Sequence, residues 1–188
     1  FQQMLEFYGL PNVPGAVTGV SGFNYVRNAP SPTNWDQFTT RIDFNESVSS
    51  QWFGRLSWGD ELGLTGNTFP SQDQTTGTRV WQAMISNVRT FSPSVVNELR
   101  VGANIFDNDR GVVFNNVRDV TSELNIPGLS SPIPAAWGAP SIGFEGNNFI
   151  SGWGETTEAP FVLRNRTYQL LDNLSWVRGK HTFKFGGE

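Results

Sequence analysis

Segments in which apolar and polar residues alternate recur along this chain, and the connections between them are short and long in turn. Alternation with a period of two is typical of a β-strand whose two faces meet different surroundings. The predicted strands, two of which alternate less regularly, cover 38–44, 51–58, 79–91, 95–106, 167–177 and 181–186. The connections cover 45–50, 59–78, 92–94, 107–166 and 178–180, and their lengths follow the order short, long, short, long, short.

This order is typical of an up-and-down barrel in an outer membrane, which has tight turns on one side and long loops on the other. A soluble β-sandwich has no reason to alternate its loop lengths strand by strand. We therefore expect an all-β fold, a partial antiparallel up-and-down transmembrane β-barrel of about six strands. Residues 1–35 are predicted to be a loop region and residues 107–166 a long extracellular loop, since so long a connector is unusual in a compact domain.

The two faces of the predicted strands differ in polarity. Apolar side chains such as Ile42, Leu56, Leu99 and Val101 share one face, which we expect to contact lipid tails. The opposite face carries charges of both signs, which suit a wide aqueous lumen. The candidate lumen-lining residues are Arg41, Asp43, Arg55, Glu98 and Arg100. In 79–91 and 167–177 neither alternate set is purely apolar, so their facing stays open. A plain solvent-facing sheet would carry the same charges.

Aromatic residues gather near both ends of the predicted strands. Membrane barrels place belts of such amphipathic rings at their two interfaces with water. The residues near the short turns are Phe44, Trp52, Phe91 and Trp176, and those near the long loops are Phe38, Trp58, Trp81 and Phe106. The long loop carries Trp137 and Trp153, which are candidate ligand contacts because exposed indole rings stack on sugar rings.

Composition excludes several classes of protein. The chain has no cysteine, which excludes disulfides and thiol catalysis, and a single histidine, which leaves a His-based metal cluster or a Ser-His-Asp triad without members. Its formal net charge is −4 and no basic stripe is present, so we expect no nucleic-acid partner. We expect no catalytic residue, no metal site, no cofactor and no enzymatic activity.

Several phrases together resemble the barrel of TonB-dependent receptors, and most closely the Oar-like group with a carboxypeptidase-regulatory-like domain. The resemblance is carried, in the family's order, by RIDFN at 41–45, WFGRLS at 52–57, FSPSVVNELRVG at 91–102, DNLSW at 172–176 and GKHTFKFG at 179–186. It implies an internal fragment of a barrel of about 22 strands in the bacterial cell outer membrane. It also implies import of an unidentified substrate, driven through a plug domain and the inner-membrane TonB complex.

Neither the plug nor the segment that contacts TonB is found in these residues, so we expect both on other parts of a longer protein. Two alternatives remain from the sequence: a soluble β-sandwich that binds carbohydrate, and a surface adhesin anchored by a barrel. The sequence leaves open the substrate, the oligomeric state and whether transport or adhesion dominates.

Overall fold

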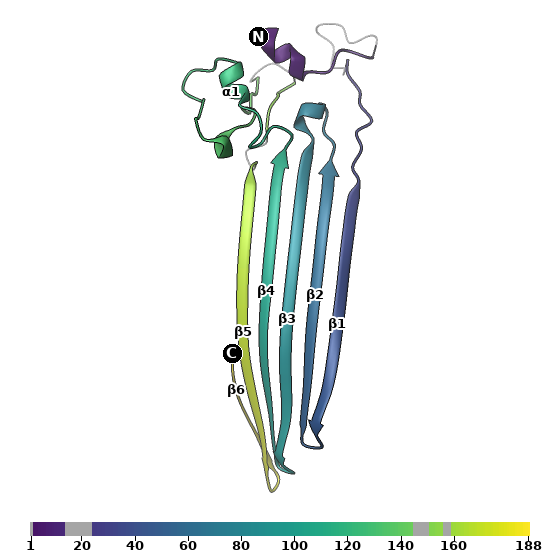
Figure 1. Cartoon of the computed structure of the whole chain (residues 1–188), viewed down its shortest axis with the longest axis vertical. Coiled ribbons are helices and arrows are strands. Elements are labelled where there is room, and N and C mark those ends of the chain that lie inside the picture. The colour runs from purple at the N-terminus through teal and green to yellow at the C-terminus, as the bar shows by residue number, and fades with distance from the viewer. Residues whose placement is uncertain (1, 14–23, 145–150, 156–158) are drawn as a thin grey trace. The chain divides into compact units, whose positions relative to one another are not determined.

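The computed structural model describes residues 2–13, 24–144, 151–155 and 159–188. Six strands form one sheet in the order β1-β2-β3-β4-β5-β6, so each strand pairs with its neighbours in sequence (Figure 1). This confirms the predicted all-β, antiparallel, up-and-down arrangement. The strands are β1 (Thr33–Ser47), β2 (Ser50–Thr65), β3 (Gln74–Ser92), β4 (Val95–Val112), β5 (Phe161–Arg178) and β6 (His181–Gly187).

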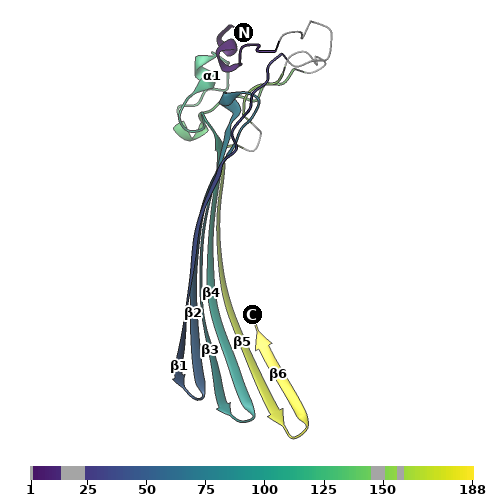
Figure 2. The ribbon, with the colours of Figure 1, turned by 90° about the vertical axis from the view of Figure 1, so that its right-hand side faces the viewer.

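Three two-residue connections, 48–49, 93–94 and 179–180, join β1 to β2, β3 to β4 and β5 to β6; Figure 2 shows these hairpins at one end of the sheet. Two of them are built alike, because the hydroxyl oxygens of Ser47 and Ser92 accept hydrogen bonds from the backbone N–H groups of Ser49 and Ser94 at 3.2 and 3.3 Å. In the third, Gly179 has φ +61°, as the first central residue of a tight hairpin requires. Each turn is therefore stabilised by residues within the turn itself.

The strands extend further toward the long connections than the alternation indicates. β4 continues to Val112 and β5 begins at Phe161, so the connection predicted for 107–166 is limited to residues 113–160. Likewise β1 begins at Thr33 rather than at Phe38. Backbone N–H and C=O groups pair without regard to side-chain polarity, so the ladder continues where the apolar pattern has already ended.

Side-chain contacts define the two faces of the sheet and settle the facing of β3 and β5. The apolar face carries Ile42 and Leu56 together with Ile85 of β3 and Leu170 of β5, which line one shallow hollow. In the β5–β6 pair, Trp176 lies opposite Phe183 with ring centroids 5.5 Å apart, on that same face by alternation. The opposite, polar face carries Arg41 above the ring of Phe53 at 4.4 Å.

No second layer of the described chain covers the apolar face. Phe44, Leu56, Leu99 and Val101 expose 60%, 37%, 38% and 44% of their surface. In a β-sandwich these side chains would be buried against a second sheet, and here the described strands form only one sheet. The soluble carbohydrate-binding sandwich, one of the two alternatives, is therefore wrong.

A second compact unit, which we call the loop unit, comprises Phe1–Asn34, Leu62–Gly77 and Asn108–Val162 and so includes the strand ends next to the long connections. Its core consists of Phe7, Phe69, Val120, Ala139 and Trp153. The short regular elements are the 3₁₀ helices η1 (Gln2–Phe7), η2 (Pro70–Gln72) and η3 (Pro134–Ala136) and the helix α1 (Val120–Glu123). Segments far apart in sequence thus share one small hydrophobic core.

Candidate functional site

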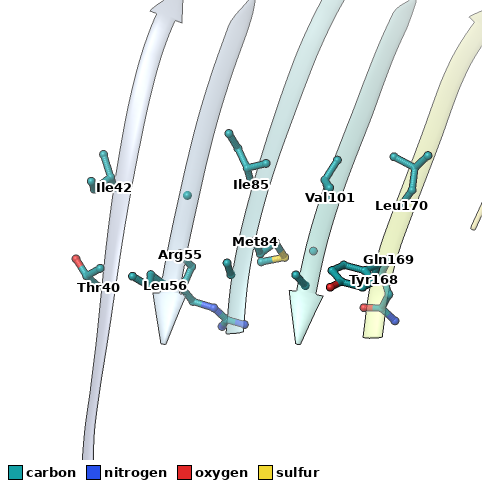
Figure 3. A pocket seen from close by; sticks show the side chains of 14 residues that line it. Thr40, Ile42, Arg55, Leu56, Met84, Ile85, Val101, Tyr168, Gln169 and Leu170 are labelled. Atoms are coloured by element: carbon teal, nitrogen blue, oxygen red, sulfur yellow. The ribbon is translucent and has the colours of Figure 1, made fainter. Parts of the chain in front are cut away.

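The apolar face carries a shallow hollow of about 770 Å³ that spans five strands (Figure 3). Thr40 and the small residues Gly54, Ala83 and Ala103 lie among larger aliphatic side chains there. The lining is almost entirely apolar. A surface of this kind is unfavourable in water and is suited to hydrocarbon.

Charged residues bound the apolar face at the end that leads into the long connections. Asp60 of β2 pairs with Arg79 of β3 at 2.7 Å, and Asp107 of β4 pairs with Arg166 of β5 at 2.6 Å. Just inside these pairs, Phe38, Trp58 and Trp81 form a cluster with ring centroids 5.9 to 6.4 Å apart. The predicted aromatic belt is thus present on three strands, although alternation places Phe106 on the polar face.

A second set of polar side chains crosses the apolar face on the side of the short turns. The Glu46 carboxylate accepts hydrogen bonds from Ser50 Oγ at 2.7 Å and Trp52 Nε1 at 3.0 Å. Further along the sheet, Asn97 Nδ2 donates to Asp172 Oδ1 at 2.6 Å. Asn97 and Asp172, two polar residues among the apolar side chains of β4 and β5, are therefore hydrogen-bond partners.

The distance between the two sets of polar side chains matches the thickness of a membrane. On β2, the ten steps from Ser50 in the second set to Asp60 in the first rise about 34 Å at about 3.4 Å each, which is about 25 Å across a bilayer for a strand tilted by about 40°. That height equals the apolar band expected of an outer-membrane barrel, about 25 Å. The apolar face thus has the chemistry and the height of a lipid-facing surface.

The five predicted lumen-lining residues share the polar face, where four of them form two ion pairs. Arg41 Nη2 contacts Asp43 Oδ1 at 2.7 Å, and Arg100 pairs with Glu98 two residues away on β4. Arg55 lies on the same face by alternation and is exposed. Each ion pair stays within one strand, so the two pairs do not come together into one cluster. Their role as a lumen lining stays a prediction.

Three buried polar atoms on this face have no hydrogen-bond partner among the described residues: Ser86 Oγ, Arg100 Nε and Asn104 Oδ1. All three belong to the adjacent strands β3 and β4. Buried polar groups in native proteins are nearly always paired with protein or water. The polar face of β3 and β4 is therefore complete only with water or a further protein segment against it. Sequence patterns could not reveal this, because alternation indicates which face Ser86 occupies and not whether its hydroxyl group has a hydrogen-bond partner.

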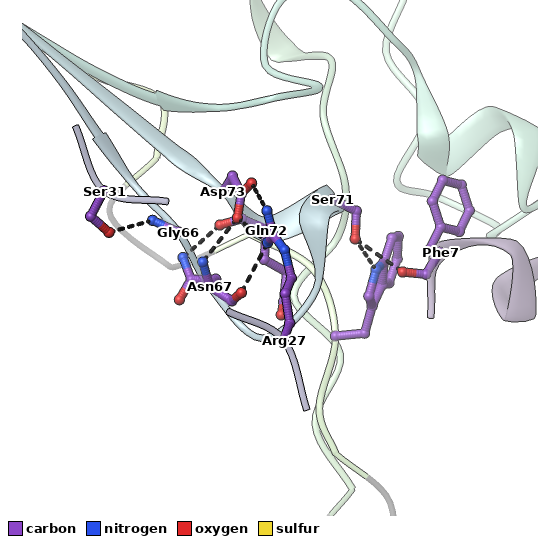
Figure 4. Close-up of polar contacts among 9 residues, drawn as sticks. Phe7, Arg27, Ser31, Gly66, Asn67, Ser71, Gln72 and Asp73 are labelled. Carbon is purple, nitrogen blue, oxygen red and sulfur yellow. Dashed lines mark hydrogen bonds and ion pairs between the residues drawn. The ribbon is translucent and has the colours of Figure 1, made fainter. Parts of the chain in front are cut away.

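Two polar clusters hold the loop unit together, and the first connects Arg27 to the β2–β3 connection (Figure 4). The Arg27 guanidinium makes two 2.6 Å hydrogen bonds to the Asp73 carboxylate, which also accepts from the backbone N–H of Asn67 at 2.9 Å. The hydrogen bonds from Arg27 lower the pKa of Asp73, against an opposing effect of burial. This fork-like pairing holds two distant segments in place.

The second cluster surrounds Glu155, which is buried in the loop unit. Its carboxylate accepts hydrogen bonds from the backbone N–H of Ala139 at 2.8 Å and from Asn115 Nδ2, while Asn115 Oδ1 accepts from the backbone N–H of Val112 at 2.6 Å. Burial raises the pKa of Glu155, and the two donors oppose that shift. Gly138 lies directly beside it, because a Cβ there would overlap the Glu155 carboxylate unless that side chain shifted.

The two tryptophans predicted as loop ligand contacts have structural partners. Trp153 is only 2% exposed, stacks near Phe7 with ring centroids 4.7 Å apart, and donates from Nε1 to Ser71 Oγ at 3.2 Å. Trp137 is half-buried and donates from Nε1 to the carbonyl oxygen of Ser131 at 2.9 Å. Trp153 therefore offers no exposed ring face in this conformation. Ligand binding by Trp137 stays a prediction.

Within residues 2–13, 24–144, 151–155 and 159–188, no group of three or more His, Asp or Glu side chains is placed to hold a metal ion. The described part of the chain contains no helix of sufficient length and hydrophobicity to cross a lipid bilayer.

Comparison with known proteins agrees with the geometry of the sheet. The family model for the outer membrane beta barrel domain matches residues 1–188. No curated protein and no solved structure matches the chain. A lipid-suited face about one membrane in height, a polar opposite face and strands joined by alternately short and long connections are the properties of that family. The chain belongs to the outer membrane beta barrel domain family and is located in the bacterial outer membrane.

Proposed function

We propose that this chain forms part of a TonB-dependent outer-membrane receptor, of the Oar-like group, that imports a substrate and is not an enzyme. The observation that carries the proposal is the incomplete polar face. Ser86, Arg100 and Asn104 present polar atoms that need partners, and Arg41 with Asp43 forms an exposed ion pair nearby in the sheet. A narrow barrel fills its interior with its own side chains, whereas a wide one leaves such groups to water or to a plug.

The phrases RIDFN at 41–45 and FSPSVVNELRVG at 91–102 support the proposal of a TonB-dependent receptor, because they resemble phrases of those receptors and occur in the same order. In the proposal, outer-membrane lipid surrounds the apolar face, a plug domain meets the polar face and the TonB complex supplies energy through parts of the protein outside this chain. The loop unit then contributes to ligand capture at the cell surface, since binding residues concentrate on loops held by a rigid scaffold.

Growth under limitation tests import directly. Cells with and without the gene for the full-length protein are grown on media limited in turn for iron, cobalamin, glycans and peptides. The proposal expects a growth defect on one of these media, and the same defect when TonB is deleted from cells that retain the gene. Equal growth of all strains on every medium would contradict import.

The adhesin remains the second candidate, because the loop unit has its own hydrophobic core and is an ordered surface rather than a set of loose connectors. An adhesin is distinguished from a transporter by whether its activity needs the energy supplied through TonB. An adhesin retains cell attachment to surfaces or to other cells when TonB is deleted, and deletion of its own gene changes attachment without changing growth on any limited medium.

A further inference from the structure

The loop unit contains a hollow of about 530 Å³ at its surface, formed by four segments of the chain. This volume lies within the range of about 300–1,000 Å³ found for small-molecule sites. The lining residues are Glu6–Gly9, Tyr25, Pro70–Ser71, Val113, Phe114 and Arg118. None of the residues predicted from sequence as ligand contacts lines it.

Aromatic rings form much of the wall of this hollow. Phe7 and Phe114 meet edge to face with centroids 5.7 Å apart, and Phe7 is itself part of the buried core. Tyr25 stacks on the buried ring of Phe69 at 5.5 Å. A Cβ at Gly9 would lie 2.2 Å from a Tyr25 ring carbon, so the Tyr25 ring rests directly on the Gly9 backbone. Packing therefore sets the orientation of the rings before any ligand arrives, which reduces the entropy lost on binding.

The polar part of the wall combines a donor and an acceptor whose charges cancel. Arg118 Nη2 contacts Glu6 Oε1 at 3.1 Å and Glu123 Oε2 at 2.6 Å, and its guanidinium lies 5.1 Å from the Phe7 ring centroid. Because Arg118 already pairs with two carboxylates, and the three groups together carry a net charge of −1, the hollow does not favour an anionic ligand. Glu6 keeps more than half of its side chain exposed, which leaves its carboxylate able to accept further hydrogen bonds.

A ligand that matches these groups is not anionic, offers hydroxyl groups to Glu6 and Arg118, and has apolar patches that pack against aromatic rings. A sugar ring has all three properties, since its C–H groups form apolar faces while its hydroxyls project from the edge. An aliphatic ligand would leave the polar groups without partners, which is unfavourable once water is displaced. We propose that this hollow binds a ring of a neutral glycan. The proposal extends the proposed import function by naming a substrate class for the loop unit.

Calorimetric titration of the full-length protein in detergent tests this proposal, with hexasaccharides of glucose in α- and β-linkage, xylose, mannose and N-acetylglucosamine as probes. At least one probe is expected to bind. Glu6→Gln and Tyr25→Ala are expected to weaken that binding by about tenfold or more, whereas Tyr25→Phe, which keeps the ring, retains it. Hydrogen exchange of the loop unit in each variant verifies that the core remains folded.

Leu129→Ala is the control, because Leu129 is an exposed residue of the same loop unit that neither lines the hollow nor contacts the side chains of Glu6 or Arg118. It is expected to leave glycan affinity within about twofold of the parent protein. The proposal is overturned if no probe binds, if Glu6→Gln and Tyr25→Ala bind as the parent does, or if a tetralysine peptide binds through Glu6 in preference to every glycan.

The result is separable from the import proposal. Glycan binding without TonB-dependent growth would leave the site intact and remove import, whereas TonB-dependent growth with no glycan bound would retain import and remove the site.

Discussion

At the scale of single residues, the two faces of the sheet should respond differently to the same added charge. Ala83 and Gln82 are neighbours on β3, both exposed, and alternation places them on the apolar and polar faces respectively. Ala83 lies near the middle of the apolar band. In the full-length protein, Ala83→Arg is expected to lower the free energy of unfolding from lipid vesicles by about 2–4 kcal/mol, since arginine at the bilayer midplane carries that cost.

Gln82→Arg is the control for the added bulk and charge. Because its side chain lies on the polar face, we expect a change in unfolding free energy within about 0.5 kcal/mol, as for ordinary surface substitutions. Denaturant titration of both variants in the same vesicles measures the difference. Equal destabilisation by the two substitutions would show that the faces are not distinct in the membrane.

Glu155 is the residue on which the loop unit most depends for its polar interior. Glu155→Ala removes the acceptor for the Ala139 N–H and for Asn115 Nδ2. Each buried donor left unsatisfied costs about 1–3 kcal/mol. Hydrogen exchange should therefore quicken around Ala139 and Asn115, with little change for Glu123→Ala at the surface of the same unit. Unchanged protection in Glu155→Ala would contradict this role.

The pH dependence of this protection has a defined sign. Burial raises the folded-state pKa of Glu155 above the ordinary value of 4.5, so the folded loop unit favours the protonated form. The stabilisation is fully present below the unfolded-state pKa and is lost as pH rises through the raised folded-state pKa. Protection near Ala139 should accordingly decline across a window above pH 4.5, and this decline should be absent from Glu155→Ala.

Trp153 illustrates why residue roles in the loops could not be predicted. In the sequence it lies in the predicted long loop, where an exposed indole ring could stack on a sugar. In the structure it pairs with Ile142 across an isolated antiparallel bridge, with hydrogen bonds of 2.7 and 2.8 Å, and packs against Phe7. Partners so distant in the chain leave no periodic signal at Trp153 itself.

At the scale of elements, the sequence predicts the existence of each strand better than its ends or its facing. The set Trp81, Ala83 and Ile85 of β3 is apolar, but it continues into Arg79 at one end and Asn87 at the other. When alternation is assessed along the whole segment, the apolar residues in the middle and the polar residues at both ends fall in the same alternate set. The sequence therefore does not show which face of the strand is apolar. Asn87 Nδ2 in fact donates to Ser50 Oγ at 3.0 Å, in the set of polar side chains near the short turns.

The β5–β6 hairpin depends on one glycine. Gly179 has φ +61°, and a Cβ built there meets no atom within 4 Å, so only backbone conformation opposes a side chain. Gly179→Ala is expected to cost about 1–2 kcal/mol of unfolding free energy, the penalty of the left-handed region. Gly77→Ala, where the space is equally open and φ is not positive, is the control and should cost less. A smaller effect at Gly179 than at Gly77 would contradict the turn assignment.

At the scale of the whole molecule, connection lengths carried more information than any single strand. The short connections predicted at 45–50, 92–94 and 178–180 require antiparallel neighbours, and together with the long ones they predict the observed strand order. The glycan-binding hollow could not be predicted, because Glu6, Tyr25 and Arg118 come together only through the shared core of the loop unit. The spacing of residues along the sequence does not show which separate segments will meet in the folded loop unit.

The central claim is that the apolar face meets lipid and the polar face meets water or protein. The chain has no cysteine, so in a cysteine-free full-length protein nitroxide labels can be placed singly at Ile42, Leu56 and Val101 and at their neighbours Arg41, Arg55 and Arg100. Electron paramagnetic resonance in lipid vesicles then compares relaxation by oxygen, which enriches in hydrocarbon, with relaxation by a water-soluble nickel chelate. We expect high oxygen and low nickel accessibility at the first three sites and a lower oxygen-to-nickel ratio at each neighbour. Equal ratios at adjacent residues, or the reverse order, would contradict the central claim.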